Sequence, residues 1–430
     1  MPNSGRPFIL YFGAVQRPEF YAGLLDQDVE LGLLLDSESV HGLEPREFTL
    51  VEKMSFSAGV EAICERIEGL RAHRHLESII NIDETLVPLW TEVCDRLGLP
   101  AMSRQAATAV RSKSEMRRRF AERIGMHVSA RSRVVTSQEE ALAFASKVGY
   151  PVVIKPGNLW GSYFVSRCDR SEDLAHAFGE IAGTLPDFST QQRVNGVPVE
   201  ILVEEFMTGT NHSVECLVLG DEVWTTPVID VVTGTDLGGN DFHHFARVTA
   251  TRLTSEEQQH MRELAAQAVR ALDVDRGIVH VEFVHGSDGS RLIEAGGRPG
   301  ANRAPLLQAA FGINLLAGYR DVLRGSTPQV ESDRHGAAAV VTPYPHTAGV
   351  LSSYRGLAEI KALTSTVQVD VYKNPGERVQ PRQEGAGSPL RIEMCADSPE
   401  QLSADLRTLT ALCEDLFDIA DTQDAAVVAL

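Results

Sequence analysis

The chain has 430 residues, of which 43% are hydrophobic and 23% charged, and its formal net charge at pH 7 is −19. That length suffices for about two to four globular domains. The acidic balance argues against nucleic acid or an anionic membrane as a partner, because both need a basic surface. One basic run, Arg117-Arg118-Arg119, is interpreted as the solvated face of a helix.

The six cysteines are scattered, without a CxxC pair or another metal-ligand spacing, so we expect buried, reduced thiols. No basic segment followed by an apolar run stands at the N-terminus, and no stretch reaches the roughly 18 apolar residues of a spanning helix. A cytoplasmic protein is the simplest interpretation.

Residues 1–111 alternate short apolar runs with helix-like segments. The runs begin at Phe8, Val29 and Ser78, and a helix is expected over 58–72. Such alternation is typical of a parallel α/β domain.

Residues 112–207 are expected to form a small α/β subdomain. Met116, Phe120 and Ile124 recur at helical spacing, and a strand, helix, strand pattern then occurs twice. The glycine-containing loop 157–163 joins the two halves and is the candidate lid.

The rest of the chain divides into a further subdomain, 208–325, and a C-terminal α+β domain, 326–430, which we expect to be separate. The expected fold is therefore multidomain, with both α/β and α+β parts. The elements expected in this half are a hairpin turning at Gly220-Asp221 and helices over 255–272, 305–323 and 399–417.

The most informative stretch is 279–300, because it offers two carboxylates on one expected hairpin with its turn at 286–289. Side chains alternate faces along each strand. If the loop has an odd number of residues centred on Asp288, Glu282 lies opposite Glu294, with Cβ atoms about 4.5 to 5.5 Å apart. That distance suits two carboxylates sharing magnesium, and without a cation it would be repulsive.

Lys155 ends the apolar strand that begins at Val152, so its ammonium group can reach toward an anion such as phosphate. The alternative is a surface lysine of no function. The loop that follows contains Gly157, Gly161 and Ser162, and glycines let backbone N–H groups approach phosphate oxygens. Such a loop can close over a nucleotide, or it can be a packed turn.

The segment Val203-Glu204-Glu205-Phe206-Met207 ends another strand. An acidic residue at this point can accept hydrogen bonds from ribose hydroxyls while the backbone meets an adenine edge. The alternative is a solvated acidic pair.

These elements occur in order with the hairpin, and the chain resembles an ATP-grasp ligase over nearly its whole length, most strongly between Lys155 and Gly300. The resemblance implies an ATP-grasp fold, ATP with Mg2+ or Mn2+ as cofactors, and small carboxylate and amine substrates. It also allows a homodimer, because the superfamily often dimerises.

The resemblance assigns roles to particular residues of this sequence. Lys155 and Arg298 match the catalytic cations, and His280 matches the histidine before the first metal carboxylate. The metal ligands match Glu282 and Glu294. The positions that match nucleotide-binding residues are Lys113, Lys155, Gly161, Ser162, Glu204, Glu205, Phe206, Met207 and Glu215.

Two positions depart from the family pattern. Gly296 stands where the family commonly has an asparagine metal ligand, which puts the number of metal ions in question. Asn211 stands where related ligases often have an acidic residue, which weakens the hinge assignment locally.

Within the superfamily, the Gly-Gly-Arg-Pro-Gly segment and the tail segments 342–345 and 349–351 resemble the L-amino-acid ligase (dipeptide synthetase) branch. The position that shapes the acceptor pocket in that branch is Asn302, and with Arg303 beside it we expect a polar or carboxylate-bearing acceptor. The loop 236–247, with His243, His244 and Arg247, lies where such ligases receive substrate, although a structural or exposed histidine pair is the alternative. The expected substrate contacts are His243, His244, His280, Arg298, Gly300, Asn302 and Arg303.

The resemblance implies an acid–amino-acid ligase that forms an amide or peptide bond through an acyl phosphate and releases ADP and phosphate. Candidates for the proton acceptor of the amine are His280, His243 and the leaving phosphate. The alternatives are an ATP-grasp carboxylase or purine-pathway ligase, and a nucleotide-binding module without turnover.

Overall fold

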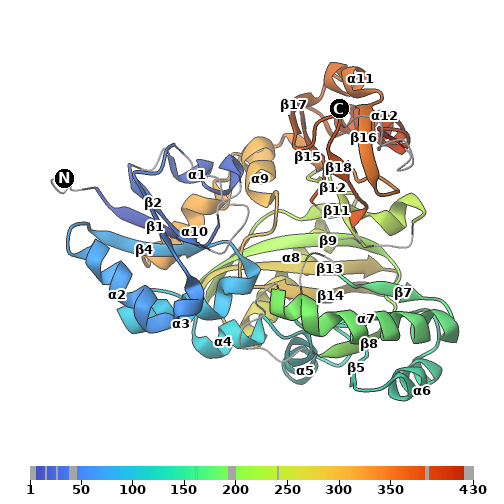
Figure 1. The fold of residues 1–430 in the computed structure, drawn as a ribbon, viewed down its shortest axis with the longest axis horizontal. Helices are drawn as coiled ribbons and strands as arrows, with labels where there is room; N and C mark the ends of the chain where they lie inside the picture. Colours follow the sequence, from blue (N-terminus) through green and yellow to red (C-terminus); the bar gives the residue numbers. More distant parts are fainter. Residues whose placement is uncertain are drawn as a thin grey trace, which may run out of the picture.

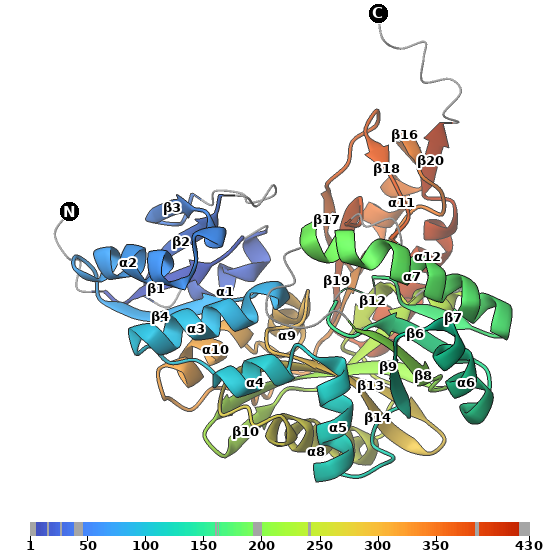
Figure 2. The same ribbon diagram turned by 60° about the horizontal axis from the view of Figure 1, so that its bottom comes forward.

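The structure is a computed structural model, and the strands that it describes form four sheets (Figure 1). The described residues are 6–14, 17–25, 28–37, 46–159, 161, 163–191, 200–239, 242–382 and 387–420, without the side chains of residue 19 and of 185–191. In both views the N-terminal domain, in blue, and the C-terminal strands, in orange and red, lie at opposite ends of the molecule (Figure 2).

The N-terminal domain is the expected parallel α/β unit, with strand order β3-β2-β1-β4. Strand β3 is the one that the apolar runs did not predict, because its sequence LVEKM mixes charged and apolar residues at a half-exposed edge. The elements are β1 (Phe8–Phe12), β2 (Glu30–Asp36), β3 (Leu50–Met54), β4 (Leu76–Asn81), α1 (Ala22–Leu25), α2 (Val60–Arg71), α3 (Val87–Leu97), and the 3-10 turns η1 (Pro18–Phe20), η2 (Phe56–Ala58) and η3 (Glu84–Leu86).

The small subdomain repeats strand, helix, strand as expected, and its antiparallel sheet has the order β5-β8-β6-β7. Helices α6 (Gln138–Val148) and α7 (Ser171–Gln191) pack with Val152 and Ile154 of β6 in a separate hydrophobic cluster. The elements are α4 (Arg104–Ala109), α5 (Lys113–Arg123), β5 (Ser132–Val135), α6 (Gln138–Val148), β6 (Val152–Pro156), β7 (Ser166–Cys168), α7 (Ser171–Gln191) and β8 (Ile201–Glu205).

The largest sheet has nine strands in the order β14-β13-β9-β11-β12-β15-β19-β17, with β10 paired to β9. Its strands and the following helices are β9 (Thr210–Leu219), β10 (Glu222–Thr225), β11 (Ile229–Thr233), η4 (Gly234–Leu237), β12 (His244–Val248), α8 (Ser255–Ala271), β13 (Arg276–Gly286), β14 (Gly289–Gly296), β15 (Ala337–Val341), β17 (Thr366–Val371) and β19 (Leu390–Ala396). The expected turn at Gly220-Asp221 joins β9 to β10.

The C-terminal segment shares this sheet with the segment before it, because β12 pairs with β15. Phe245 on β12 also packs in one hydrophobic cluster with Ile392 and Leu409. The domain boundary expected near residue 325 stays a prediction, and it would divide the strands of one continuous sheet between two domains. The other elements of this segment are β16 (Gly349–Tyr354), α11 (Leu357–Ala362), β18 (Arg378–Val379), α12 (Pro399–Glu414) and β20 (Phe417–Ala420).

The single helix expected over 305–323 is wrong, because the structure has two helices there, α9 (Arg303–Phe311) and α10 (Leu315–Leu323). Gly312 ends α9 in the left-handed conformation, with φ of 70°. Asn314 begins α10, and its side chain accepts a hydrogen bond from the Ala317 amide.

The hairpin of β13 and β14 places Glu282 opposite Glu294, as expected, but a bulge in β14 produces this pairing and not a loop with an odd number of residues. The loop has two residues, an even number, because Gly286 pairs with Gly289. The pairing of Phe283 with Leu292 is followed by that of Glu282 with Glu294, so Ile293 is an extra residue on β14. This β-bulge shifts the register by one and brings the two carboxylates opposite each other.

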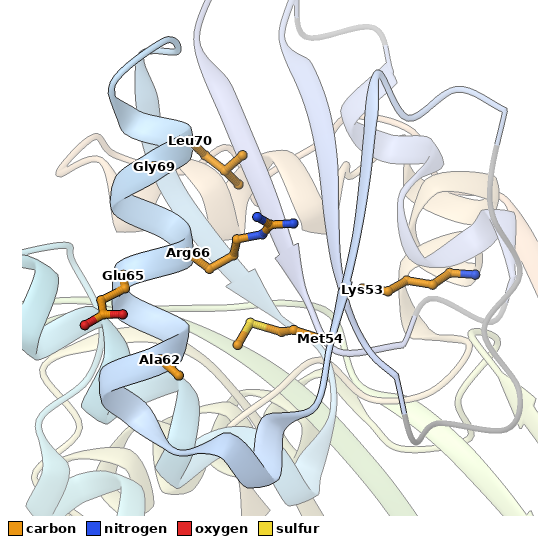
Figure 3. Close-up of a pocket in the computed structure, with 7 residues that line it drawn as sticks. All are labelled: Lys53, Met54, Ala62, Glu65, Arg66, Gly69 and Leu70. Atoms are coloured by element: carbon orange, nitrogen blue, oxygen red, sulfur yellow. The ribbon is translucent and has the colours of Figure 1, made fainter.

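A surface hollow of about 610 Å³ lies between β3 and α2, far from the hairpin in the sequence. Figure 3 shows Arg66 and Met54 between the helix and the strand, while Lys53 points away from the helix. None of the residues that line it is a predicted site residue. No helix among the described residues is long and apolar enough to cross a bilayer. The six cysteines are free thiols, and four of them are buried.

Candidate active site

One face of the nine-stranded sheet bears the polar residues of the candidate site. Glu282 pairs with Glu294 on one side and with Ser213 of β9 on the other, so all three share a face. The register continues through β11 to Arg247 on β12, on the same face. The opposite face carries buried apolar residues such as Val214 and packs against α8.

Each of the two carboxylates lies beside a basic side chain, Lys113 from α5 for Glu294 and His280 from the same strand for Glu282. Glu294 Oε2 is 3.1 Å from Lys113 Nζ, and Glu282 Oε1 is 3.0 Å from His280 Nε2. His244 Nε2 lies 3.8 Å from the same Glu282 oxygen. Burial alone would raise the pKa of Glu282, but the two histidines and Arg303 outweigh it and hold the pKa well below its ordinary range. Glu282 is therefore a carboxylate at neutral pH.

His280 lies between two carboxylates. Its Nδ1 is 2.5 Å from Glu215 Oε1, and its Nε2 contacts Glu282. Glu215 also accepts a hydrogen bond of 3.0 Å from the Gly300 amide, so it ties the turn after Arg298 to the strands. Burial lowers the pKa of His280, but the two carboxylates outweigh burial and raise the pKa above its ordinary value. The geometry makes His280 a residue that orients Glu282.

Lys113 and Lys155 lie on two sides of the start of the lid loop. Lys113 begins α5, donates its backbone N–H to Gly157 O at 2.8 Å, and donates Nζ to Leu159 O at 2.6 Å. Lys155, 5% exposed on β6, has its Nζ 2.6 Å from Glu204 Oε2. Burial lowers the pKa of Lys155, and Lys113 contributes to the lowering.

Arg117 completes this group, and it overturns the interpretation of the basic run as a solvated face. Arg117 and Arg119 are each 5% exposed, and only Arg118 lies at the surface. Arg117 donates to both oxygens of Glu204, at 2.8 and 3.2 Å, and its Nη1 has no acceptor in the described part of the chain. Arg117 and Lys155 thus share the buried carboxylate of Glu204, while Lys113 pairs with Glu294, so three cations face two carboxylates beside loop 157–163.

The expected adenine hinge begins with two acidic side chains that are both in ion pairs. Glu204 binds Arg117 and Lys155, and Glu205 pairs with Arg131 and Arg291. The alternative of a solvated acidic pair is therefore wrong. Phe206 and Met207 continue the segment past the end of β8, half-buried, and the Arg167 guanidinium lies 4.7 Å from the Phe206 ring centre.

The lid residues are only partly described. Gly161 has φ of 65°, and its carbonyl accepts a 2.8 Å hydrogen bond from Arg382 Nη2. Ser162, predicted at the nucleotide, lies outside the described residues.

Arg298 is held by a residue that the sequence did not single out. Its Nε lies 2.8 Å from Glu84 Oε2, in the η3 turn of the N-terminal domain. Arg111 donates Nη1 to Glu84 Oε1 and Nη2 to Asn158 O, both at 2.9 Å. Glu84, 3% exposed, therefore connects the N-terminal domain, the lid loop and Arg298. A lone glutamate in a turn offers no pattern that would have revealed this.

The position of Glu84 also explains the glycine at 296. A Cβ atom at Gly296 would lie 2.8 Å from Glu84 Oε2, which is closer than non-bonded atoms approach. The space of a side chain at 296 is taken by the carboxylate of Glu84.

The substrate end is formed by the start of α9 and the loop before β12. Asn302 precedes α9 with φ of 63°, and its Oδ1 accepts from Arg391 Nε at 2.8 Å. Arg303 donates Nε to Ser213 Oγ at 2.9 Å, which places it beside Glu282 on the sheet. The ring of His243 lies 5.0 Å from that of Tyr344, edge to face. Arg391 and Tyr344, from the C-terminal segment, were not predicted.

Residues 148–304 match the family described as the ATP-grasp domain. The chain thus contains an ATP-grasp domain, as the resemblance implied. Among relatives of known activity, alanine–anticapsin ligase of Bacillus subtilis is 24% identical over 277 residues, which are 61% of this chain and 57% of that protein. The chain spans little more than half the length of the curated relatives that it matches.

Solved structures extend the likeness to nearly the whole chain. The L-amino acid ligase of Bacillus licheniformis has a TM-score of 0.77 and 18% identity, covering 97% of this chain and 99% of that one. The biotin carboxylase domain of 2-oxoglutarate carboxylase from Hydrogenobacter thermophilus, solved with MgADP and bicarbonate, has a TM-score of 0.69 and 12% identity, covering 96% and 90%. These likenesses establish an ATP-grasp fold.

Proposed function

We propose that this protein is an ATP-dependent carboxylate–amine ligase that joins amino acids, or an amino acid and a related small acid, through an acyl phosphate. The observation that carries the proposal is the pairing of Glu282 with Glu294 between Lys113 and His280, with Arg298 just past the same hairpin. The similarity to alanine–anticapsin ligase and to an L-amino acid ligase fold supports it. We expect small-molecule substrates, a cytoplasmic location and a homodimer.

The nucleotide phosphates would bind at Lys113 and Lys155. Both amines are buried, and with Arg117 they outnumber the carboxylates of Glu204 and Glu294 by one. An anion there would oppose the burial and the repulsion by Arg117 and Lys113 that lower the pKa of Lys155. The adenine edge would meet the backbone at Phe206 and Met207, because the carboxylates of Glu204 and Glu205 are already in ion pairs.

Glu282 and Glu294 fit a shared Mg2+ or Mn2+ ion, because two opposed carboxylates are hard oxygen ligands on one face. No cluster of three or more His, Cys, Asp or Glu in the described residues could hold an ion alone. The remaining ligands would therefore be phosphate oxygens and water, as magnesium commonly has in such sites. A bound ion would neutralise charge on the transferring phosphoryl group.

In the first step an oxygen of the donor carboxylate attacks the γ-phosphorus of ATP, and the bond to ADP breaks. In the second step the amine nitrogen attacks the acyl carbon, the bond to phosphate breaks, and the nitrogen loses a proton. Arg298 would stabilise the oxyanion of that tetrahedral intermediate. His280 is unsuited as the base, because carboxylates occupy both ring nitrogens. The leaving phosphate is our preferred acceptor of the proton.

A pairwise screen of amino acids, scored by phosphate release and product mass, tests the proposal. The expected result is ADP and phosphate in equal amounts with an amide product for at least one pair. ADP release with bicarbonate alone would favour a carboxylase instead. Tight ATP binding without ADP formation across the screen would favour a module without turnover.

A further inference from the structure

The substrate end holds two buried arginines whose hydrogen-bonding capacity is only partly used. Arg303, 1% exposed, donates to Ser213 Oγ and to Ala301 O, and its Nη2 has no acceptor among the described residues. Arg247, 9% exposed, donates Nη1 to His244 O at 3.0 Å and to Thr342 Oγ1 at 2.7 Å, and no described residue accepts from its Nε. Buried N–H groups without partners are rare in native proteins.

These two guanidinium groups act on one another electrostatically. Burial, followed by the charge of Arg303, lowers the pKa of Arg247 to about 9. Burial also lowers the pKa of Arg303, and Arg298 adds to that effect, while the carboxylates of Glu215 and Glu282 oppose it. The pKa of both arginines stays lowered despite these carboxylates, so a further anion beside the pair would stabilise their charged forms.

The strand order places this pair away from the nucleotide lysines. Lys113 contacts Glu294 on β14, whereas Arg303 is anchored on β9 and Arg247 lies on β12. Four strand spacings separate β14 from β12, or about 19 Å at roughly 4.8 Å each. The arginines therefore lie on the opposite side of the carboxylate pair from Lys113, where a substrate rather than a nucleotide phosphate would bind.

We propose that Arg247 and Arg303 form a subsite for a substrate carboxylate that is not consumed in the reaction. A guanidinium group presents a planar fork that matches a carboxylate, and two such groups would neutralise and orient it. The inference rests on the proposed ligase function and names its substrate class, in which at least one substrate keeps a free carboxylate. That group is either the α-carboxylate of an acceptor amino acid or the side-chain carboxylate of an acidic donor.

Binding of a plain dicarboxylate tests the subsite without turnover. Glutarate and glutaramide, its uncharged diamide, are each titrated into the nucleotide-free protein, and binding is measured by calorimetry. Glutarate should bind and glutaramide should not, and Arg303→Gln or Arg247→Gln should weaken glutarate binding about ten- to hundredfold. Arg262→Gln is the control, because Arg262 is half-buried and donates to Thr225 from α8, on the other face of the sheet.

One further variant, Arg303→Lys, covers the case in which the glutamine variant does not fold. If Arg303→Gln does not fold, Arg303→Lys retains the charge without the fork and should weaken glutarate binding by a smaller factor. Wild-type affinity in both glutamine variants, or equal binding of glutarate and glutaramide, would overturn the proposal.

Turnover then identifies the source of the carboxylate. Two exchanges are compared: an acceptor amino acid is replaced by its carboxamide, and a glutamate donor by glutamine. Only one of them should raise the KM of the exchanged substrate, by about tenfold or more. In Arg303→Gln, the KM values before and after that exchange should be equal. If neither exchange changes KM, the proposal fails. If no pair of substrates is turned over, the ligase assignment fails, and the glutarate titration still decides the subsite.

Discussion

Replacing Glu84 by glutamine tests whether this side chain of the N-terminal domain holds Arg298, the residue that we propose stabilises the oxyanion. The Glu84 carboxylate lies 2.8 Å from Arg298 Nε and 2.9 Å from Arg111 Nη1, and its side chain is 2% exposed. Removing one partner from a buried ion pair costs about 3–5 kcal/mol. Glutamine keeps one acceptor, worth about 1 kcal/mol, so we expect a loss of about 2–4 kcal/mol and, for a chain of 430 residues, a fall in Tm of roughly 2–4 °C.

The assay combines thermal unfolding with ADP release on the same preparations. In Glu84→Gln we expect kcat/KM to fall at least about tenfold, because Arg298 loses the group that positions it. Glu77→Gln is the control, since Glu77 binds Arg320 at 2.7 and 3.3 Å and also joins the N-terminal domain to the central part. It should lose stability and keep its kinetics. Equal kinetic losses in both variants, or a Tm of Glu84→Gln within about 1 °C of wild type, would refute the reasoning.

Three other predictions concern Glu294, Gly296 and the buried ion pairs of Glu204. Glu294→Ala should abolish ADP formation with Mg2+ while circular dichroism shows an intact fold, and near-normal turnover would exclude the metal assignment. Gly296→Asn should lower Tm without improving turnover, because its Cβ would lie 2.8 Å from the Glu84 carboxylate; an unchanged Tm would contradict this. Although burial raises the pKa of Glu204, Arg117 and Lys155 outweigh it and hold the pKa at about 2. Its stabilisation is therefore complete above the unfolded value of about 4.3 and is lost as the pH falls toward 2. Thermal melts of wild type and Glu204→Gln should differ most near pH 7 and converge at low pH, whereas a constant difference would oppose the ion-pair account.

Much of the secondary structure followed from local pattern. The helix expected over 255–272 appears as α8, Ser255–Ala271, because its amphipathic run is preceded by a capping box of Thr254 and Glu257. The parallel N-terminal domain followed from alternating apolar runs and helices, and the order of elements in the small subdomain followed in the same way. The break at Gly312 and Asn314 was also present in the sequence, but the apolar pattern on both sides masked it.

The candidate site was predictable where its residues lie on neighbouring strands or match a family motif. Glu282 and Glu294 could be paired because a hairpin brings residues close in sequence into register. The route to that register, a bulge at Ile293, could not be predicted, because it depends on how β14 packs beyond the hairpin.

The sequence by itself determined most of the order of strands and helices and the hairpin that carries the carboxylate pair, because these depend on periodicity and on contacts within short segments. Only the tertiary structure decided that Arg117 is buried, that Glu84 holds Arg298 and fills the space at Gly296, and that Arg247 and Arg303 share a face with Glu282. Each of these depends on segments far apart in the chain, whose side chains meet only after the sheets and helices have packed.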